Sequence, residues 1–147
     1  MIMANTKPFV QAASVCEKIL IEPDGVASLI RMVDVFHLDL ESTPVVPNIP
    51  PGMQFAVVIA LKSGDVAGNF DMGVRLVRPS GKVEDTQNIP VVLQGGGHGA
   101  NIRINVVIAN PEYGLHWFDV LWSGEILTRI PLDLKKAKPS QTNKPEA

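Results

Sequence analysis

The sequence predicts an all-β protein, and three observations support this prediction. Apolar residues alternate with polar ones in several segments, most clearly between Phe70 and Leu76. A period of two is the period of a β-strand that buries one face. Turn residues interrupt these segments, and the connections are too short for crossover helices, which favours antiparallel neighbours. We therefore expect an antiparallel, two-sheet β-sandwich of about eight strands, with a barrel as the alternative.

The first part of the chain predicts a long hairpin, a connection and a central strand. Residues 9–21 and 26–36 flank Glu22-Pro23-Asp24-Gly25, in which Pro presets the first corner of a turn and Gly accepts a positive φ. A helix over residues 11–18 is the alternative there, because Ala, Gln, Glu and Lys favour one. Four prolines between residues 38 and 51 exclude a regular helix or central strand. Residues 53–62 are more continuously apolar, which suits a strand covered on both faces.

The second part of the chain predicts further hairpins. Pro90 cannot donate a ladder hydrogen bond, so we expect the strand that contains it to be edge-like. Ser123-Gly124 predicts a two-residue hairpin connection. The expected elements are a turn over 63–68, strands over 69–78 and 82–93, a flexible loop at Gly95–Gly99, and strands over 101–108, 115–122 and 125–134.

The chain of 147 residues predicts one domain, without an internal repeat. We expect a flexible N-terminus over residues 1–7, a single β-sandwich domain over residues 8–134 and a disordered C-terminal tail over residues 135–147. The tail is rich in Lys, Pro, Ser, Gln, Thr and Asn, which is too polar to pack.

Charge and cysteine content limit the classes of function. The tail carries four lysines against one glutamate, so it is at +3 and the remainder of a chain of net charge −2 is at −5. An acidic body does not suit nucleic acid, whose binding depends on clustered Lys and Arg. A single cysteine, Cys16, forms no intramolecular disulfide, and we find no signal peptide or transmembrane segment. We therefore expect a cytoplasmic protein that binds neither nucleic acid nor membranes.

No motif predicts a catalytic residue, a metal site or a cofactor. Gly95–Gly99 is followed by a strand, whereas phosphate loops precede a helix. His37, His98 and His116 lack the close spacing of zinc ligands. Cys16 lies within an alternating strand, which favours a buried apolar role over that of a nucleophile.

One segment carries residues typical of recognition surfaces. Alternation over residues 116–122 places His116, Phe118, Val120 and Trp122 on one face of a strand. Trp117 and Leu121 then lie on the opposite face, with Asp119 between them. Exposed aromatic residues are typical of interfaces. We predict Trp117 and Leu121 as interaction residues, with cover by the chain's own loops as the alternative.

Two segments carry a resemblance to a known family. Cys16-Glu17-Lys18-Ile19-Leu20 with Asp24-Gly25-Val26-Ala27-Ser28-Leu29-Ile30 resembles the opening hairpin of a family of small bacterial proteins of unknown function. Gly114-Leu115-His116-Trp117-Phe118-Asp119-Val120, Gly124-Glu125 and Ile130-Pro131-Leu132 are similar to its closing hairpin, where an aromatic residue normally stands in place of His116. The resemblance implies an immunoglobulin-like β-sandwich and supplies no activity.

Three functional hypotheses follow. The first is a non-catalytic module for protein interaction or self-assembly, because the charged content of 19% is low and Trp117 and Leu121 face outward. The second is a small-ligand or carbohydrate-binding module in which Trp117 or Trp122 stacks on a sugar ring. The third is an enzyme or metal site assembled from distant loops, with His37 and His98 among its residues.

Overall fold

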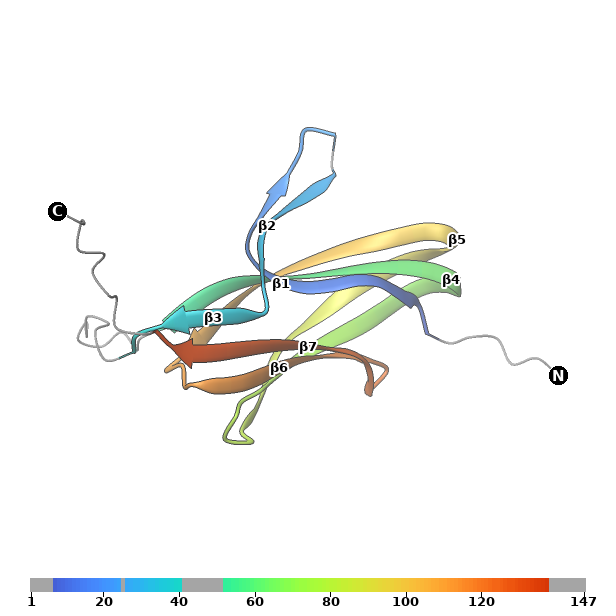
Figure 1. Cartoon of the computed structure of the whole chain (residues 1–147). Helices are drawn as coiled ribbons and strands as arrows, with labels where there is room; N and C mark the ends of the chain where they lie inside the picture. The colour runs from blue at the N-terminus through green and yellow to red at the C-terminus, as the bar shows by residue number, and fades with distance from the viewer. Residues whose placement is uncertain (1–6, 25, 41–51, 138–147) are drawn as a thin grey trace.

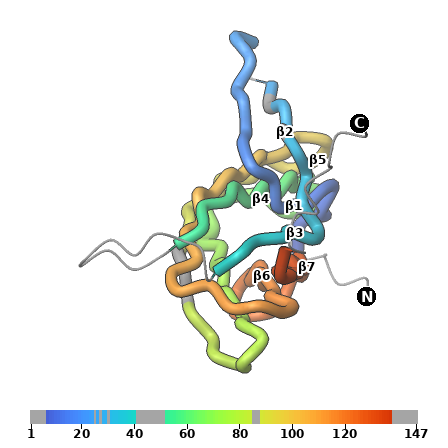
Figure 2. The backbone as a smooth tube through the Cα atoms, turned by 60° about the vertical axis from the view of Figure 1, so that its left-hand side comes forward, coloured from blue at the N-terminus to red at the C-terminus, as the bar shows by residue number. Residues whose placement is uncertain are grey.

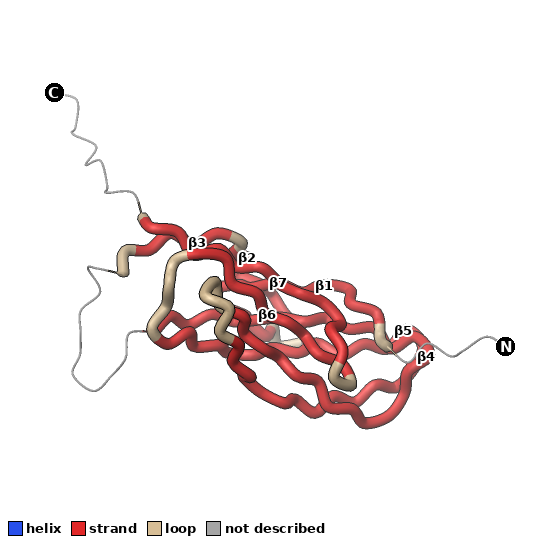
Figure 3. Tube along the Cα trace, turned by 90° about the horizontal axis from the view of Figure 1, so that it is seen from below, coloured by secondary structure: helices blue, strands red, loops and turns tan. Residues whose placement is uncertain are grey.

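The computed structural model describes residues 7–24, 26–40 and 52–137, which form seven strands and no helix (Figure 3). The strands are β1 (Phe9–Ile21), β2 (Ala27–Val33), β3 (Val35–Leu38), β4 (Gly52–Val77), β5 (Val83–Ala109), β6 (Gly114–Trp122) and β7 (Glu125–Lys136). The all-β prediction is confirmed. The described part of the chain contains no helix able to span a bilayer. The predicted connection over residues 41–51, residues 1–6 and residues 138–147 lie outside the described residues.

The strands form one curled, mixed sheet, whereas the sequence predicted two antiparallel sheets. Hydrogen bonding gives the order β2-β1-β4-β6-β7-β3, with β5 beside β4. Every pair is antiparallel except β3 and β7, which are parallel. The sheet curls around the core (Figure 2). Because β2 and β3 follow each other directly in the chain, they bring the two ends of the curled sheet together at Asp34.

Two long strands explain why the sheet is continuous. β4 has 26 residues and β5 has 27, and they stay paired as both fold over between the two layers (Figure 1). Their register shifts between Lys62 and Ala67, a segment that contains Gly64 with a φ of 59° and is directly followed by Gly68 with a φ of 129°. Only glycine adopts such angles readily, so bulges form here without ending the strands. The turn predicted over 63–68 and the loop predicted at Gly95–Gly99 are therefore wrong, since both segments belong to strands.

The core lies between two layers of this sheet. The first layer contains β1 with the first part of β4 and the last part of β5, and the second contains the remainder of β4 and β5 with β6, β7 and β3. The alternation after Phe70 is confirmed, because Met72, Val74 and Leu76 are all buried. β5 pairs with β4 alone, which confirms the edge strand predicted from Pro90. β7 extends to Lys136, into the predicted tail, because β3 pairs with its end.

The β1–β2 hairpin projects from the first layer, and we call residues 17–33 the arm (Figure 1). β1 pairs with β4 up to Cys16 and with β2 from Val15 onward, so the arm is a two-stranded ribbon. Arg31 has a φ of 54° at its base, and its guanidinium lies 3.4 Å from the Glu17 carboxylate. Beyond this point Ile19 and Leu29 pack against an outer cluster of Cys16, Ala56 and Val58.

Replacing Gly99 by alanine is expected to lower the free energy of unfolding by about 1–3 kcal/mol, measured by urea denaturation. A Cβ at Gly99 would lie 2.5 Å from the carbonyl oxygen of Leu61, so the backbone of β4 or β5 must shift. Gly97 is the matched control, because a Cβ there would meet nothing within 4 Å. Equal effects of G99A and G97A would show that close approach of the two strands is unimportant.

Candidate functional site

The strand predicted to carry recognition residues has the predicted alternation. His116, Phe118, Val120 and Trp122 of β6 are buried in the core. Trp117 and Leu121 lie on the opposite, outward face of the second layer, and both are half-buried. Leu121 is next to Gly73 of β4, whose missing side chain leaves room for it. We call Trp117, Asp119 and Leu121 the Trp117 face.

Arg129 of β7 covers part of the Trp117 face. Its guanidinium carbon lies 4.6 Å from the centre of the Trp117 ring, which is the geometry of a cation–π contact. Its Nε donates to Asp119 Oδ1 at 2.7 Å, and the Asp119 side chain is only 5% exposed. One side chain therefore neutralises a buried carboxylate and shields an aromatic ring, so the Trp117 face offers less apolar surface than the sequence suggested.

The arm exposes more apolar surface than the Trp117 face, and sequence reasoning missed it. Leu20, Ile21, Val26 and Met32 are 39%, 49%, 58% and 66% exposed. The run Ile19-Leu20-Ile21 just before a turn was the available signal, because a half-buried hairpin tip normally alternates. A two-stranded ribbon is marginally stable in water without further contacts. The arm thus combines exposed apolar side chains with backbone edges that pair with no further described strand.

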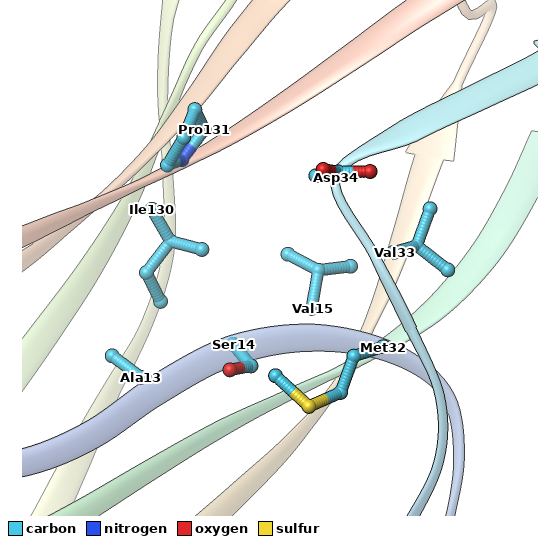
Figure 4. Close-up of a pocket in the computed structure, with 8 residues that line it drawn as sticks. All are labelled: Ala13, Ser14, Val15, Met32, Val33, Asp34, Ile130 and Pro131. Carbon is cyan, nitrogen blue, oxygen red and sulfur yellow. The ribbon is translucent and has the colours of Figure 1, made fainter.

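A cavity of about 290 Å³ lies where the ends of the curled sheet meet. β1 and β7 border it, and the crossing from β2 to β3 borders it on a further side (Figure 4). Its lining is mostly apolar, with Ser14 and Asp34 as polar groups: Ala13, Ser14, Val15, Met32, Val33, Asp34, Ile130 and Pro131. The Asp34 carboxylate accepts the N–H of Val35 at 2.7 Å.

The three histidines do not converge. β3, which carries His37, and the bend of β5 at Gly95–Gly99 lie at opposite ends of the molecule (Figure 1). His116 is buried in the core. Among the described residues no group of three His, Cys, Asp or Glu side chains could hold a metal ion. Cys16 is buried, and burial raises the pKa of its thiol, which agrees with the predicted apolar role.

Stability is expected to fall between neutral pH and pH 5 because of His116. The carbonyl of Gly114 lies 3.0 Å from Nδ1 and accepts its hydrogen, while the buried Nε2 has no hydrogen-bond partner among the described residues. Burial lowers the pKa of His116 in the folded state, and the positive charge of Arg78 adds to this, while the hydrogen bond to the Gly114 carbonyl and the negative charge of Glu112 oppose it. Below a pH of about 6.5, the ordinary histidine pKa, the unfolded chain binds more protons and stability is lost.

H116F is the matched variant for this pH dependence. It keeps a buried aromatic ring but has no titrating group, so its free energy of unfolding should fall less steeply with pH. Urea denaturation at pH 7.5, 6.5, 5.5 and 5 measures the difference. Parallel curves for the two proteins would contradict the prediction.

Comparisons with known proteins give weak structural likenesses. No protein-family model matches the sequence, and no curated protein matches it. A β-glucosidase from Listeria innocua is 14% identical, with a TM-score of 0.46 over 88% of this chain and 16% of the glucosidase. An alkylpurine DNA glycosylase from Pseudomonas fluorescens, bound to DNA containing an abasic site analog, is 16% identical, with a TM-score of 0.46 over 84% of this chain and 30% of the glycosylase. The chain spans less than a third of either protein, and neither likeness bears on function.

Proposed function

We propose that this protein is a non-catalytic protein-binding module and that the arm is its main binding element. The observation that carries the proposal is the exposure of Leu20, Ile21, Val26 and Met32 on a projecting ribbon. Exposed apolar side chains beside unpaired strand edges are the features that added strands and partner surfaces use. The Trp117 face is a second contact region, with Arg129 as a rim residue that a partner displaces or stacks on.

Site-specific photo-cross-linking in cells tests this function. A benzophenone side chain replaces Val26 in the arm or, as the control, Val83, which is 52% exposed against 58% for Val26. We expect discrete protein adducts from position 26 and few from position 83, with adducts identified by mass spectrometry. Absence of adducts at position 26, or the same adducts at both positions, would overturn the proposal.

A small-ligand module is the second candidate, and the cavity between β1 and β7 favours it. The cavity is close to the lower limit of about 300 Å³ for small-molecule sites. Its lining of apolar side chains with the Asp34 carboxylate suits a small apolar amine. A thermal-shift screen with such amines, repeated on A13L to fill the cavity, tests it. Trp122 does not stack on a sugar, because it is buried against Phe70 with ring centroids 4.9 Å apart.

The fold relationship, the cellular location and the excluded partners are part of the same proposal. We retain an immunoglobulin-like relationship for the domain, supported by two facing layers around one core. We also propose a cytoplasmic protein that binds neither nucleic acid nor membranes, supported by the single buried cysteine and by the acidic body.

A further inference from the structure

We propose that the partner of the arm is a second copy of this chain, and that two copies clasp each other by exchanging arms. This inference rests on the proposed function, since it names the partner of the same element. In the clasp, the arm of each copy lies across the outer face of the first layer of the other.

The outer face is basic and contains small side chains. It is formed by residues 9–16 of β1, 52–62 of β4 and 99–109 of β5, which together contain Lys62 and Arg103 and no carboxylate. Small side chains lie along the middle of β1 and β4: Ala12, Ser14 and Ala60 are at least partly exposed, whereas Cys16, Ala56 and Val58 are buried beneath Ile19 and Leu29 of the chain's own arm. The larger exposed side chains of Phe9 and Gln54 lie toward the ends of these segments. A face of this kind lets another strand pair approach closely, because few long side chains stand in its way.

The tip of the arm is acidic. The turn between β1 and β2 carries Glu22 and Asp24, both exposed. Asp24 Oδ1 accepts the N–H of Val26 at 3.1 Å, and Glu22 Oε1 accepts the hydroxyl of Ser28 at 3.0 Å, so the carboxylates are held on the turn. The tip therefore carries two negative charges and the outer face two positive ones. A surface that is complementary to itself is what a two-fold dimer requires.

The dimensions of the arm and the outer face agree. The shaft of the arm, residues 17–21, is about 17 Å long at about 3.4 Å per residue, and three paired strands are about 14 Å wide at about 4.8 Å each. The arm leaves the first layer on its outer side, away from the second layer (Figures 1 and 2). Two such molecules, related by a two-fold axis, place each arm along the other's outer face.

The clasp also covers the apolar residues of the arm. Ile19 and Leu29 already pack on the outer cluster at the corner between arm and face. Leu20, Ile21, Val26 and Met32 are the exposed residues that remain. The arm has 17 residues and the outer face has 30, of which about half point outward in a sheet. The residues available for contact therefore number about 30, at the upper end of the roughly 20–30 residues that each partner gives to a standard interface.

Charge reversal in the full chain tests the clasp. Sedimentation velocity between about 1 and 100 μM should show a dimer. E22K/D24K should weaken it about 10- to 100-fold, because like charges then face each other, and K62E/R103E should do the same. The quadruple variant should restore the dimer, since both signs are exchanged. Mixing the two double variants should give a heterodimer, because all facing charges are then opposite.

The controls distinguish failure of the clasp from failure of the proposed function. D71K reverses an exposed charge in the second layer and should leave the dimer unchanged. Circular dichroism checks that each variant folds, and the mixing experiment gives a result even if the quadruple variant does not. A monomer at 100 μM, or dimers insensitive to both reversals, would overturn the clasp. Adducts at position 26 with a different protein would then leave the proposed function standing, whereas no adducts would defeat both.

Discussion

Replacing Phe118 by alanine is expected to lower the free energy of unfolding by about 3–5 kcal/mol. Phe118 is fully buried on β6, between Leu76 of β4 and Ile130 of β7 in the register of the sheet. Truncation removes most of a large apolar side chain and leaves a cavity that strands on both sides cannot close. The loss is a large part of the 5–15 kcal/mol typical of a domain.

Urea denaturation followed by tryptophan fluorescence measures this loss, with Leu115→Ala as the matched control on the same strand. Leu115 is 43% exposed, so its truncation should lower the free energy of unfolding by less than about 1 kcal/mol. An F118A variant as stable as L115A would show that the core between the two layers is not packed as described.

Replacing Arg78 by methionine is expected to lower the free energy of unfolding by about 2–3 kcal/mol. The Arg78 side chain is 8% exposed and joins three segments. Nη2 donates to the Ala109 carbonyl at 2.6 Å, Nη1 to the Asn110 carbonyl at 3.1 Å, and Nε to Glu84 Oε1 at 3.2 Å. Methionine keeps the apolar stem but leaves the two carbonyls and the carboxylate without these donors.

Lys82→Met is the matched control for Arg78, because Lys82 approaches the same carboxylate at 3.4 Å but is 69% exposed. Its loss should change the free energy of unfolding by less than about 0.5 kcal/mol. The hydrogen bond from Arg78 is the main reason why the pKa of Glu84 is below its ordinary value. NMR titration should therefore show the Glu84 pKa rising in R78M and much less in K82M. Equal effects of the two variants on stability would contradict this account.

The faces of the strands could be predicted from the sequence alone. Alternation assigned Phe118, Val120 and Trp122 to the core and Trp117 and Leu121 to the outside, and the structure agrees. The Ser123-Gly124 hairpin was also predictable, and both residues have the positive φ values that a tight turn of this kind uses. These features are local, because side-chain direction and turn conformation depend on neighbouring residues.

The number of strands could not be predicted from local sequence patterns. About eight strands were expected, and seven form among the described residues, because two predicted pairs of strands merge into β4 and β5 while the strand predicted over 26–36 divides into β2 and β3. Each change depends on a distant partner. Gly64 and Ala67 continue their strand because Gly96 and Gln94 of β5 pair with them. Val35 begins a new strand because it pairs with Asp133 of β7.

The sequence by itself determined an all-β chain, the inward and outward sides of its strands, and an outward position for Trp117. Only the tertiary structure decided that the strands form one curled sheet, that the arm projects with Leu20, Ile21, Val26 and Met32 exposed, and that Arg129 covers Trp117. The physical reason is that alternation fixes which side of a strand is apolar. It does not fix which strand, cation or second molecule covers that side, because those contacts join residues far apart in the chain.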